Sequence, residues 1–305
     1  MTDTLRLLSS RASALALAAG FAALGSACLT NAPDPNAGGI YSCVDSSECP
    51  GTQSCLQGTC ETITLPVVKI LNPEDGDDFD YQGGGMDQTI NISVNATDFI
   101  LRPRSQSTEA VPGEGHLVFF LDEVEVGVID SGDLGGGVQL QMVPLPDVPG
   151  VHRIRVQARF NDGTDYDNEG AAPRNLIWVD DGNEHIAFRS PWPGEVFSLE
   201  SQQVNAEIAA FGGIVIDEPG SGEEHVHVYY DEAFPACLDD MACEDRYSGV
   251  VPSNEDIFGP VIFPESGATM VTLTALTRQS NHDRYLDPNG LPVIAQIQVL
   301  RSNAQ

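Results

Sequence analysis

Basic residues are scarce in this chain. Its 305 residues include 14 Lys and Arg against 45 Asp and Glu, and Lys69 is the single lysine. Proteins that bind nucleic acid neutralise phosphates with clustered Lys and Arg, so this composition excludes nucleic acid as a partner. Hydrophobic residues still make up 41% of the chain. We therefore expect the acidic residues to lie on the surface of folded domains, where they favour solubility.

Signatures of common enzyme families are also missing. The chain has no Gly-x-Ser-x-Gly elbow, no His-Glu-x-x-His pair and no Gly-Lys-Ser/Thr phosphate loop. No lysine and no helical pattern follow the glycine runs 83–85 and 135–137, so we expect these runs to be loops. Carboxylates are numerous enough to pair by chance, and a carboxylate-dependent hydrolase is a minor alternative. We predict that the protein is not an enzyme.

No segment is uniformly apolar over the roughly 20 residues that a membrane-spanning helix needs. The best candidate, Ala12 to Leu24, follows Arg6 and Arg11 and leads into small residues before Cys28. A short apolar stretch between basic and small residues is typical of a secretory signal peptide. We therefore expect residues 1–27 to be removed on export, leaving no transmembrane helix.

Seven cysteines are an odd number for an exported protein, in which thiols are normally paired. Residues 24–28, Leu-Gly-Ser-Ala-Cys, resemble the lipobox of bacterial lipoproteins, with Gly25 where that motif usually has leucine. The resemblance implies that Cys28 is acylated and becomes the mature N-terminus, and Leu29 after it points to the outer membrane or cell surface. Ordinary cleavage that leaves a free thiol is the alternative. Residues 28–40, rich in Pro, Asn and Gly, are the expected tether.

Four cysteines lie close together in residues 41–61, with the spacing C-x5-C-x5-C-x4-C. So short a segment needs cross-links, and we expect two disulfides among Cys43, Cys49, Cys55 and Cys60. Three pairings are open, and we favour Cys43 with Cys55 and Cys49 with Cys60. Zinc is the alternative, although zinc sites favour C-x2-C pairs. The stretch resembles the short cysteine-rich modules that follow the lipobox in many myxobacterial surface lipoproteins.

The last two cysteines, Cys237 and Cys243, lie in a polar segment near the C-terminal end. We expect them to close a local loop disulfide. One lipidated cysteine, four in the module and two in this loop account for all seven.

The rest of the chain contains two copies of one pattern. Each copy begins with P-x-x-G-x-x-F, continues with an alternating apolar and polar segment, and then has two glycine-led strand-like segments. Alternation with a period of two residues is typical of half-buried strands. The matching segments are 73–79 and 191–197, 90–94 and 204–208, 113–123 and 222–232, and 150–158 and 267–275.

Strand-like segments at regular spacing, with Gly, Pro and Asp turns, indicate antiparallel sandwiches. In the order of its motifs, each copy resembles bacterial immunoglobulin-like domains, over residues 62–182 and 183–305. The resemblance implies an all-β protein of two tandem immunoglobulin-like β-sandwiches, preceded by the disulfide-stapled module. It implies a fold and no activity. Neither copy has the Cys…Trp…Cys core of antibody domains, so we expect apolar packing to hold each sandwich together.

Two histidines stand out in the second copy. His225 and His227 flank Val226 on one expected strand, so both imidazoles lie on the face opposite to the valine. If this strand pairs antiparallel with residues 270–277, His282 follows the end of that neighbour and lies near the pair. Neutral imidazoles so placed could bind Zn²⁺ or Cu²⁺. The alternative is two solvent-facing histidines on an open sheet face.

An acidic loop, residues 161–169, offers a second candidate metal site in the first copy. Oxygen ligands at short spacing suit Ca²⁺, which exported modules bind at millimolar concentrations. The loop lacks the spacing of an EF-hand, so a plain acidic turn is the alternative. The candidate ligands are Asp162, Asp165, Asp167 and Glu169.

The sequence thus predicts a non-catalytic cell-envelope lipoprotein, anchored in the outer membrane and either periplasmic or at the cell surface. Its sandwich loops are expected to bind an envelope protein or a polysaccharide, and its lipid is the expected membrane contact. Binding of Cu, Zn or Ca is the alternative function. Trp192, between two prolines, is either an exposed contact for such a partner or a lid over the junction of the two copies.

Overall fold

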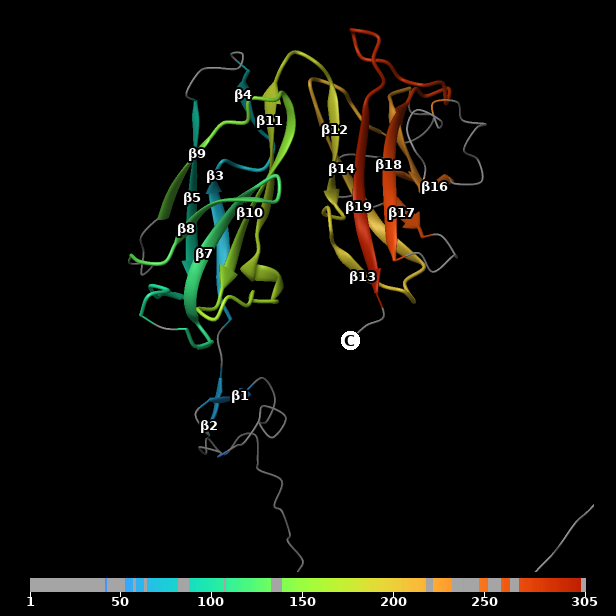
Figure 1. Ribbon diagram of the computed structural model, residues 1–305. Coiled ribbons are helices and arrows are strands. Elements are labelled where there is room, and N and C mark those ends of the chain that lie inside the picture. Colours follow the sequence, from blue (N-terminus) through green and yellow to red (C-terminus); the bar gives the residue numbers. More distant parts are fainter. Residues whose placement is uncertain are drawn as a thin grey trace, which may run out of the picture. The chain divides into compact units, whose positions relative to one another are not determined.

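The computed structural model describes the chain as two compact units, residues 1–62 and 63–305 (Figure 1). The described part is built of strands and one short 3-10 helix, η2 (Glu169–Ala171). None of its helices has the length and apolar character needed to cross a membrane. Described are residues 42, 53–56, 59–62, 65–81, 88–106, 108–132, 139–217, 222–231, 238, 247–251, 259–263 and 269–302.

The first unit contains one antiparallel pair, β1 (Gln53–Leu56) with β2 (Thr59–Thr62). Cys60 on β2 is buried and disulfide-bonded. The signal peptide, the tether and the side chains of the other six cysteines lie outside the described residues. The lipid anchor and the disulfide pairings therefore stay predictions, which concern Cys28, Cys43, Cys49, Cys55, Cys60, Cys237 and Cys243.

The first sandwich lies between residues 65 and 180 and packs a small sheet against a large one. Its small sheet has the order β3-β5-β9, and its large sheet the order β4-β11-β10-β7-β6, with β8 also paired to β7. The strands are β3 (Val67–Asn72), β4 (Asp77–Asp80), β5 (Thr89–Thr97), β6 (Ile100–Leu101), β7 (Glu114–Leu121), β8 (Val124–Ile129), β9 (Gln139–Pro144), β10 (Gly150–Arg159) and β11 (Arg174–Asp180).

The second sandwich, residues 185–302, repeats this arrangement. Its small sheet has the order β12-β14-β17, and its large sheet the order β13-β19-β18-β15-β16. The strands are β12 (His185–Ser190), β13 (Val196–Ser198), β14 (Gln203–Phe211), β15 (His225–Tyr230), β16 (Tyr247–Val251), β17 (Gly259–Ile262), β18 (Met270–Arg278) and β19 (Ile294–Ser302).

Alternating side chains fill a separate core in each sandwich. On β5, Ile90, Ile92 and Val94 are buried in the first core, whereas Asn91 between them is exposed. Period-two burial of this kind is what the sequence pattern predicts for a sheet with one face on a core. The all-β class expected from the sequence is confirmed, and the boundary expected near residue 182 falls in the turn between β11 and β12.

The repeated motifs occupy matching places in the two sandwiches. The peptide bonds before Pro73 and Pro191 are both cis, and the following Gly76 and Gly194 both have positive φ angles, of 93° and 78°. Glycine suits these positions because it lacks the Cβ that disfavours such angles. The P-x-x-G-x-x-F motif therefore marks the same turn twice.

The sequence alignment of the glycine-led strands was wrong by two residues. Leu121 lies opposite Ile154 in the first sandwich, and Tyr230 lies opposite Leu273 in the second. Ile154 thus corresponds to Leu273, whereas the alignment matched it with Val271. A slip of two keeps the same side chains on the core face, so the apolar pattern could not reveal it.

A third apolar cluster joins the two sandwiches. Trp192 is buried in it, and the indole Nε1 donates a hydrogen bond of 2.6 Å to Glu123 Oε1. The rings of Trp178 and Phe211, one from each sandwich, lie 6.1 Å apart between centroids. Trp192 is therefore a lid at the junction and not an exposed contact. The buried members are Leu176, Ala187, Trp192, Ala209 and Phe211, with Val151 and Trp178 packed against them.

The first sandwich also contains a buried histidine held by a carboxylate. His152 Nδ1 lies 2.6 Å from Asp122 Oδ2, and Nε2 lies 2.7 Å from the Val148 carbonyl. Burial lowers the pKa of His152, but the hydrogen bond and charge of Asp122 outweigh burial and raise it. For Asp122, burial raises the pKa, and hydrogen bonds from His152 and the Arg153 amide bring it below its usual range.

We expect Asp122→Asn to destabilise the protein by about 1 kcal/mol near pH 6 and to flatten the pH dependence of stability above that pH. The raised pKa of His152 adds stability that is complete below the unfolded pKa of about 6.5 and is lost as pH rises through the folded pKa. The lowered pKa of Asp122 adds stability above about pH 4 that is lost as pH falls through the folded pKa.

Urea unfolding at pH values from 4 to 8 measures both effects. The control is Asp231→Asn at the matching turn of the second sandwich, where apolar Val271 replaces His152, so the pH dependence should be that of the wild type. If Asp122→Asn keeps the wild-type loss of stability above pH 6.5, the assignment of that loss to His152 is wrong.

Candidate metal centre

Strand β15 places two histidines on the outward face of the large sheet in the second sandwich. Val226 and Val228 alternate with them and are buried in the core of that sandwich. His225 is 0% exposed and His227 is 4% exposed. The alternative of two solvent-facing histidines is therefore wrong. The outward face is covered here, where Leu238 packs against the buried side chains of this sheet.

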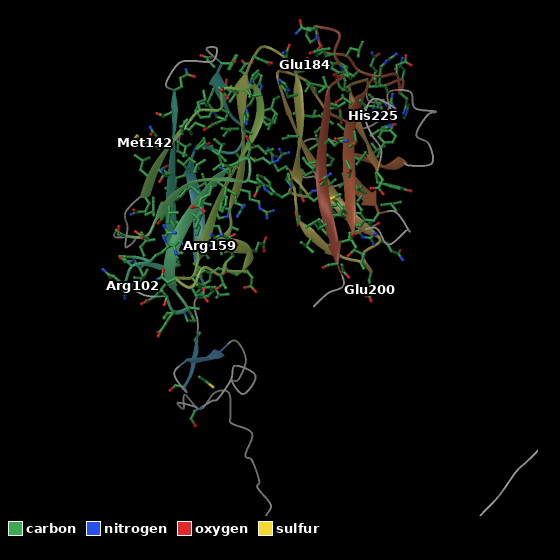
Figure 2. The ribbon with its side chains drawn as sticks, in the orientation of Figure 1. Arg102, Met142, Arg159, Glu184, Glu200 and His225 are labelled. Atoms are coloured by element: carbon green, nitrogen blue, oxygen red, sulfur yellow. The ribbon has the colours of Figure 1, made fainter. Side chains whose placement is uncertain are left out.

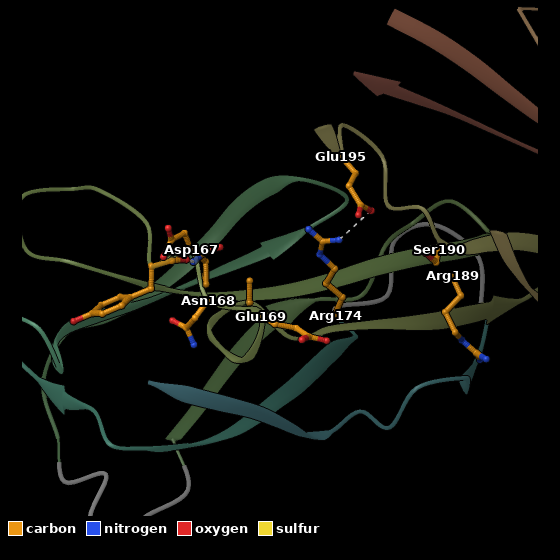
Figure 3. Close-up of a pocket in the computed structure, with 10 residues that line it drawn as sticks. Asp167, Asn168, Glu169, Arg174, Arg189, Ser190 and Glu195 are labelled. Carbon is orange, nitrogen blue, oxygen red and sulfur yellow. Dashed lines mark hydrogen bonds and ion pairs between the residues drawn. The ribbon is translucent and has the colours of Figure 1, made fainter. Parts of the chain in front are cut away.

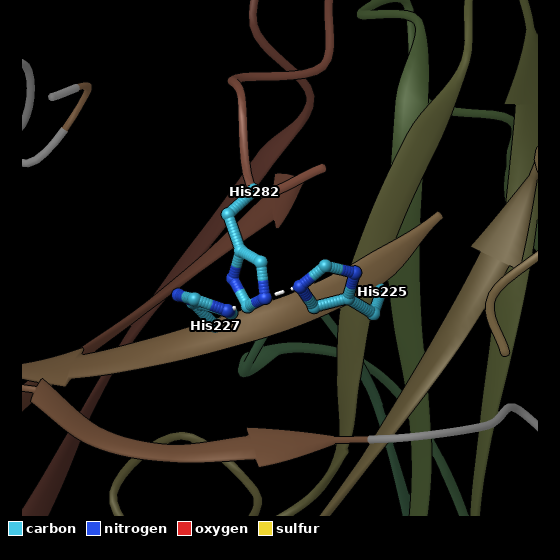
Figure 4. Close-up of side chains that lie close together, drawn as sticks. All are labelled: His225, His227 and His282. Atoms are coloured by element: carbon cyan, nitrogen blue, oxygen red, sulfur yellow. Dashed lines mark hydrogen bonds between the residues drawn. The ribbon is translucent and has the colours of Figure 1, made fainter. Parts of the chain in front are cut away.

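The third histidine comes from the turn after the neighbouring strand. β18 runs antiparallel to β15, so the start of β15 lies beside the end of β18, as the sequence analysis required. In the turn that follows, the His282 amide donates to the Gln279 carbonyl at 2.8 Å, and His282 has a φ angle of 68°. The ring returns over the strand pair, with its centroid 4.8 Å from that of His225 and 5.3 Å from that of His227 (Figure 4).

The three imidazoles gather their nitrogens around one point. One ring nitrogen of each lies within 4.8 Å of the other two, and His225 Nε2 is 3.1 Å from His227 Nε2. Three nitrogens that share a tetrahedral zinc ion at about 2.0–2.1 Å lie about 3.3 Å apart, which is close to the separation of the His225 and His227 nitrogens. Across the described residues, this is the one group of three or more His, Cys, Asp or Glu side chains so arranged.

Further buried groups orient the site from the far side of His227. Its Nδ1 lies 3.4 Å from the hydroxyl of Tyr229, to which the Arg278 guanidinium donates at 3.0 Å. Arg278 also donates to the Leu238 carbonyl at 3.0 Å. A histidine ligand keeps its ring orientation when its second nitrogen has an outer partner. These contacts favour the ring position in which Nε2 of His227 points toward the shared point.

Sequence reasoning missed Tyr229 and Arg278 as parts of this site. The alternation His-Val-His-Val-Tyr already places Tyr229 on the histidine face, and this signal could have found it. Arg278 gives no such signal, because its approach depends on the pairing of β15 with β18.

The donor set points to a particular group of metals. Three neutral imidazoles suit Zn²⁺ and Cu²⁺, whereas Ca²⁺ and Mg²⁺ prefer oxygen ligands. His282 is exposed while the two strand histidines are buried, so the site has one solvent-facing side. Three protein ligands leave a fourth position of a tetrahedral ion for water or another donor.

The acidic loop of the first sandwich does not form a comparable site. Asp162 Oδ1 accepts hydrogen bonds from the Thr164 amide and hydroxyl, which lower the pKa of Asp162. Asp165 forms an ion pair with Arg159 at 2.5 Å. These contacts are those of a plain acidic turn, the alternative to the candidate Ca²⁺ site. No three carboxylates gather among Asp162, Asp165, Asp167 and Glu169.

A cavity of about 530 Å³ lies beside this loop, lined in part by Asp167 and Glu169 (Figure 3). Its two arginines are engaged by carboxylates: Arg174 lies 3.7 Å from Glu195, and Arg189 pairs with residues of both sandwiches. Charges of both signs thus compensate one another around the cavity. The cavity presents no ligand-specific arrangement that would make it a second candidate centre.

No family model and no curated protein matches the chain. Among solved structures, the fibronectin(III)-like modules of Clostridium thermocellum CbhA match at 13% identity and a TM-score of 0.24, over 77% of this chain and 95% of theirs. The BSP domain of a biofilm associated protein matches at 13% identity and a TM-score of 0.26, over 79% of this chain and 30% of that chain. The N-terminal eight Ig domains of Down Syndrome Cell Adhesion Molecule match at 9% identity and a TM-score of 0.31, over 81% of this chain and 29% of that chain. These matches carry no inference about what the chain does.

Proposed function

We propose that the protein is a non-catalytic, exported lipoprotein that binds Zn²⁺ or Cu²⁺ through His225, His227 and His282. The observation that carries this proposal is the gathering of three imidazole nitrogens within 4.8 Å of one another. Two of the rings are buried on the outward sheet face, and the third returns to them from a separate turn. A metal ion binds the neutral form of each imidazole.

Metal binding is tested by isothermal titration calorimetry on the chain from residue 28 with Cys28→Ser, after removal of metal by a chelator. We expect one Zn²⁺ or Cu²⁺ per chain at micromolar concentrations, and release of protons on binding because imidazole must be neutral. Millimolar Ca²⁺ serves as the comparison and should give no heat, since the acidic loop does not gather its carboxylates. Absence of heat with both Zn²⁺ and Cu²⁺ would overturn the proposal.

A second candidate function is that of an adhesive or scaffold protein of the cell envelope. It is supported by two sandwiches that contact each other through a buried apolar cluster. The partner would be an envelope protein or a polysaccharide, and the anchor a lipid on Cys28 in the outer membrane. Mass spectrometry of the N-terminal peptide checks this anchor. An unmodified Cys28 would remove the lipoprotein part of both candidate functions.

A further inference from the structure

The junction inside the chain is formed by two different sheet faces. The large-sheet face is the outward side of the large sheet, and the small-sheet face is the outward side of the small sheet. The large-sheet face of the first sandwich packs on the small-sheet face of the second. The first contributes Val151, Leu176 and Trp178, and the second contributes Ala187, Ala209 and Phe211. The small-sheet face of the first sandwich and the large-sheet face of the second therefore take no part in this junction.

The large-sheet face of the second sandwich carries an exposed apolar row. Val196 on β13 lies beside Leu300 on β19, which lies opposite Met270 on β18. These side chains are 58%, 41% and 54% exposed. Met270 and Leu300 form a cross-strand pair that corresponds to the pair Val151 and Trp178 of the first sandwich. In the first sandwich this pair is part of the junction.

The small-sheet face of the first sandwich is also partly apolar. On its edge strand β9, Leu140 and Met142 are 56% and 64% exposed. Figure 2 shows Met142 pointing away from the first sandwich. Val67 and Leu71, on β3 at the other side of the same face, are exposed as well. This face corresponds to the one that is covered in the second sandwich.

Among the described residues, none of the outward side chains of β3, β5, β9, β13, β18 and β19 is a carboxylate, although the chain has 45 Asp and Glu. The basic residues among these side chains are Lys69, the single lysine of the chain, on the small-sheet face and the buried Arg278 on the large-sheet face. On the small-sheet face the outward residues are Val67, Lys69, Leu71, Thr89, Asn91, Ser93, Asn95, Thr97, Leu140, Met142 and Pro144. On the large-sheet face the outward residues of β13, β18 and β19 are Val196, Ser198, Met270, Thr272, Thr274, Leu276, Arg278, Ile294, Gln296, Gln298, Leu300 and Ser302, and those of β15 are His225, His227 and Tyr229.

Charge decides which occupant fits these faces. A chain of net charge −31 repels its own copies wherever carboxylates face each other. At the described outward side chains of these strands a second copy meets no facing carboxylate, and each face resembles the kind of face that already packs inside the chain. We propose that copies of this chain associate head to tail, with the large-sheet face of the second sandwich of one copy packing on the small-sheet face of the first sandwich of the next. Such a heterologous contact builds rings or open chains.

Sedimentation velocity on the chain from residue 28 with Cys28→Ser tests this association between about 1 and 500 μM. The buffer contains EDTA, so that metal cannot bridge copies. We expect the mean mass of the wild type to rise beyond that of a dimer, and to rise more at high salt, which screens the net charge. A wild type that stays monomeric at every concentration would overturn the proposal.

Two double variants distinguish head-to-tail from face-to-face contact. Leu140→Glu with Met142→Glu removes one face, and Met270→Glu with Leu300→Glu removes the other. Each should be monomeric alone, whereas an equimolar mixture should form a dimer and nothing larger, because one intact face of each kind remains. If one double variant associates like the wild type, the contact joins identical faces and the proposal is wrong.

A matched control places glutamates on exposed valines outside both faces. Val124→Glu with Val215→Glu adds the same charge, one residue in each sandwich, at side chains that are strongly exposed. It should associate like the wild type. Equal urea midpoints for all three double variants would show that the changes act on association and not on folding.

Discussion

Replacing His227 by alanine is expected to weaken Zn²⁺ binding by more than about 100-fold, which is the upper end of the loss caused by changes outside the ligand set. His227 Nε2 lies 3.1 Å from His225 Nε2, and His227 Nδ1 lies 3.4 Å from the Tyr229 hydroxyl. Its loss removes a ligand and the contact that orients the site. His282→Ala should weaken binding less, because its exposed turn contributes one ligand and leaves the buried strand pair in place. Calorimetry of the three proteins side by side gives the ratios.

The control for this series is His185→Ala. His185 belongs to the same sandwich, but its Nε2 lies 3.2 Å from Asp181 and it does not belong to the histidine group. Its removal should leave metal affinity unchanged within twofold. Equal affinities of His227→Ala and the wild type, with both proteins folded by circular dichroism, would show that the imidazole group holds no metal.

Phe119→Ala is expected to cost about 3–5 kcal/mol of unfolding free energy. Phe119 is fully buried on β7, in the centre of the first core. Truncation removes the transfer free energy of the ring and leaves a cavity that neighbouring β-branched and aliphatic side chains cannot fully close. Guanidinium unfolding followed by circular dichroism measures the change.

Leu140→Ala on the exposed side of the same sandwich is the comparison for Phe119→Ala. Leu140 is largely exposed, and such surface changes usually stay within about 0.5 kcal/mol. A cost below about 1 kcal/mol for Phe119→Ala would contradict the placement of this ring in a close-packed core.

The candidate metal site shows how far local patterns extend. Alternation along a strand placed His225 and His227 on one face, and the expected pairing of strands brought His282 to them. The pattern could not predict that this face is covered. Both rings are buried, and Leu238 packs against Tyr229 and Leu276 on the same face. Arg278 joins the site through the same pairing, and a single sequence gives no signal for it.

The geometry of the acidic loop, residues 161–169, could not be predicted from the sequence for a related reason. Four carboxylates at short spacing are visible in the sequence, but the positions of their oxygens depend on the backbone turn and on nearby donors. Asp162 closes its own turn with Thr164, and Asp165 is drawn to Arg159 on the preceding strand. Local hydrogen bonds and an ion pair therefore took the oxygens that a Ca²⁺ ion would need.

The residue pattern was sufficient for the all-β class, for two copies of one sandwich, and for the choice of side chains that face each core. These features depend on period-two alternation and on turn residues, which act over a few positions along the chain. Tertiary structure alone decided the register between strands and the burial of the histidines. It also decided that the large-sheet face of the first sandwich packs on the small-sheet face of the second. Those features depend on contacts between segments far apart in sequence, and a two-residue slip leaves the local pattern unchanged.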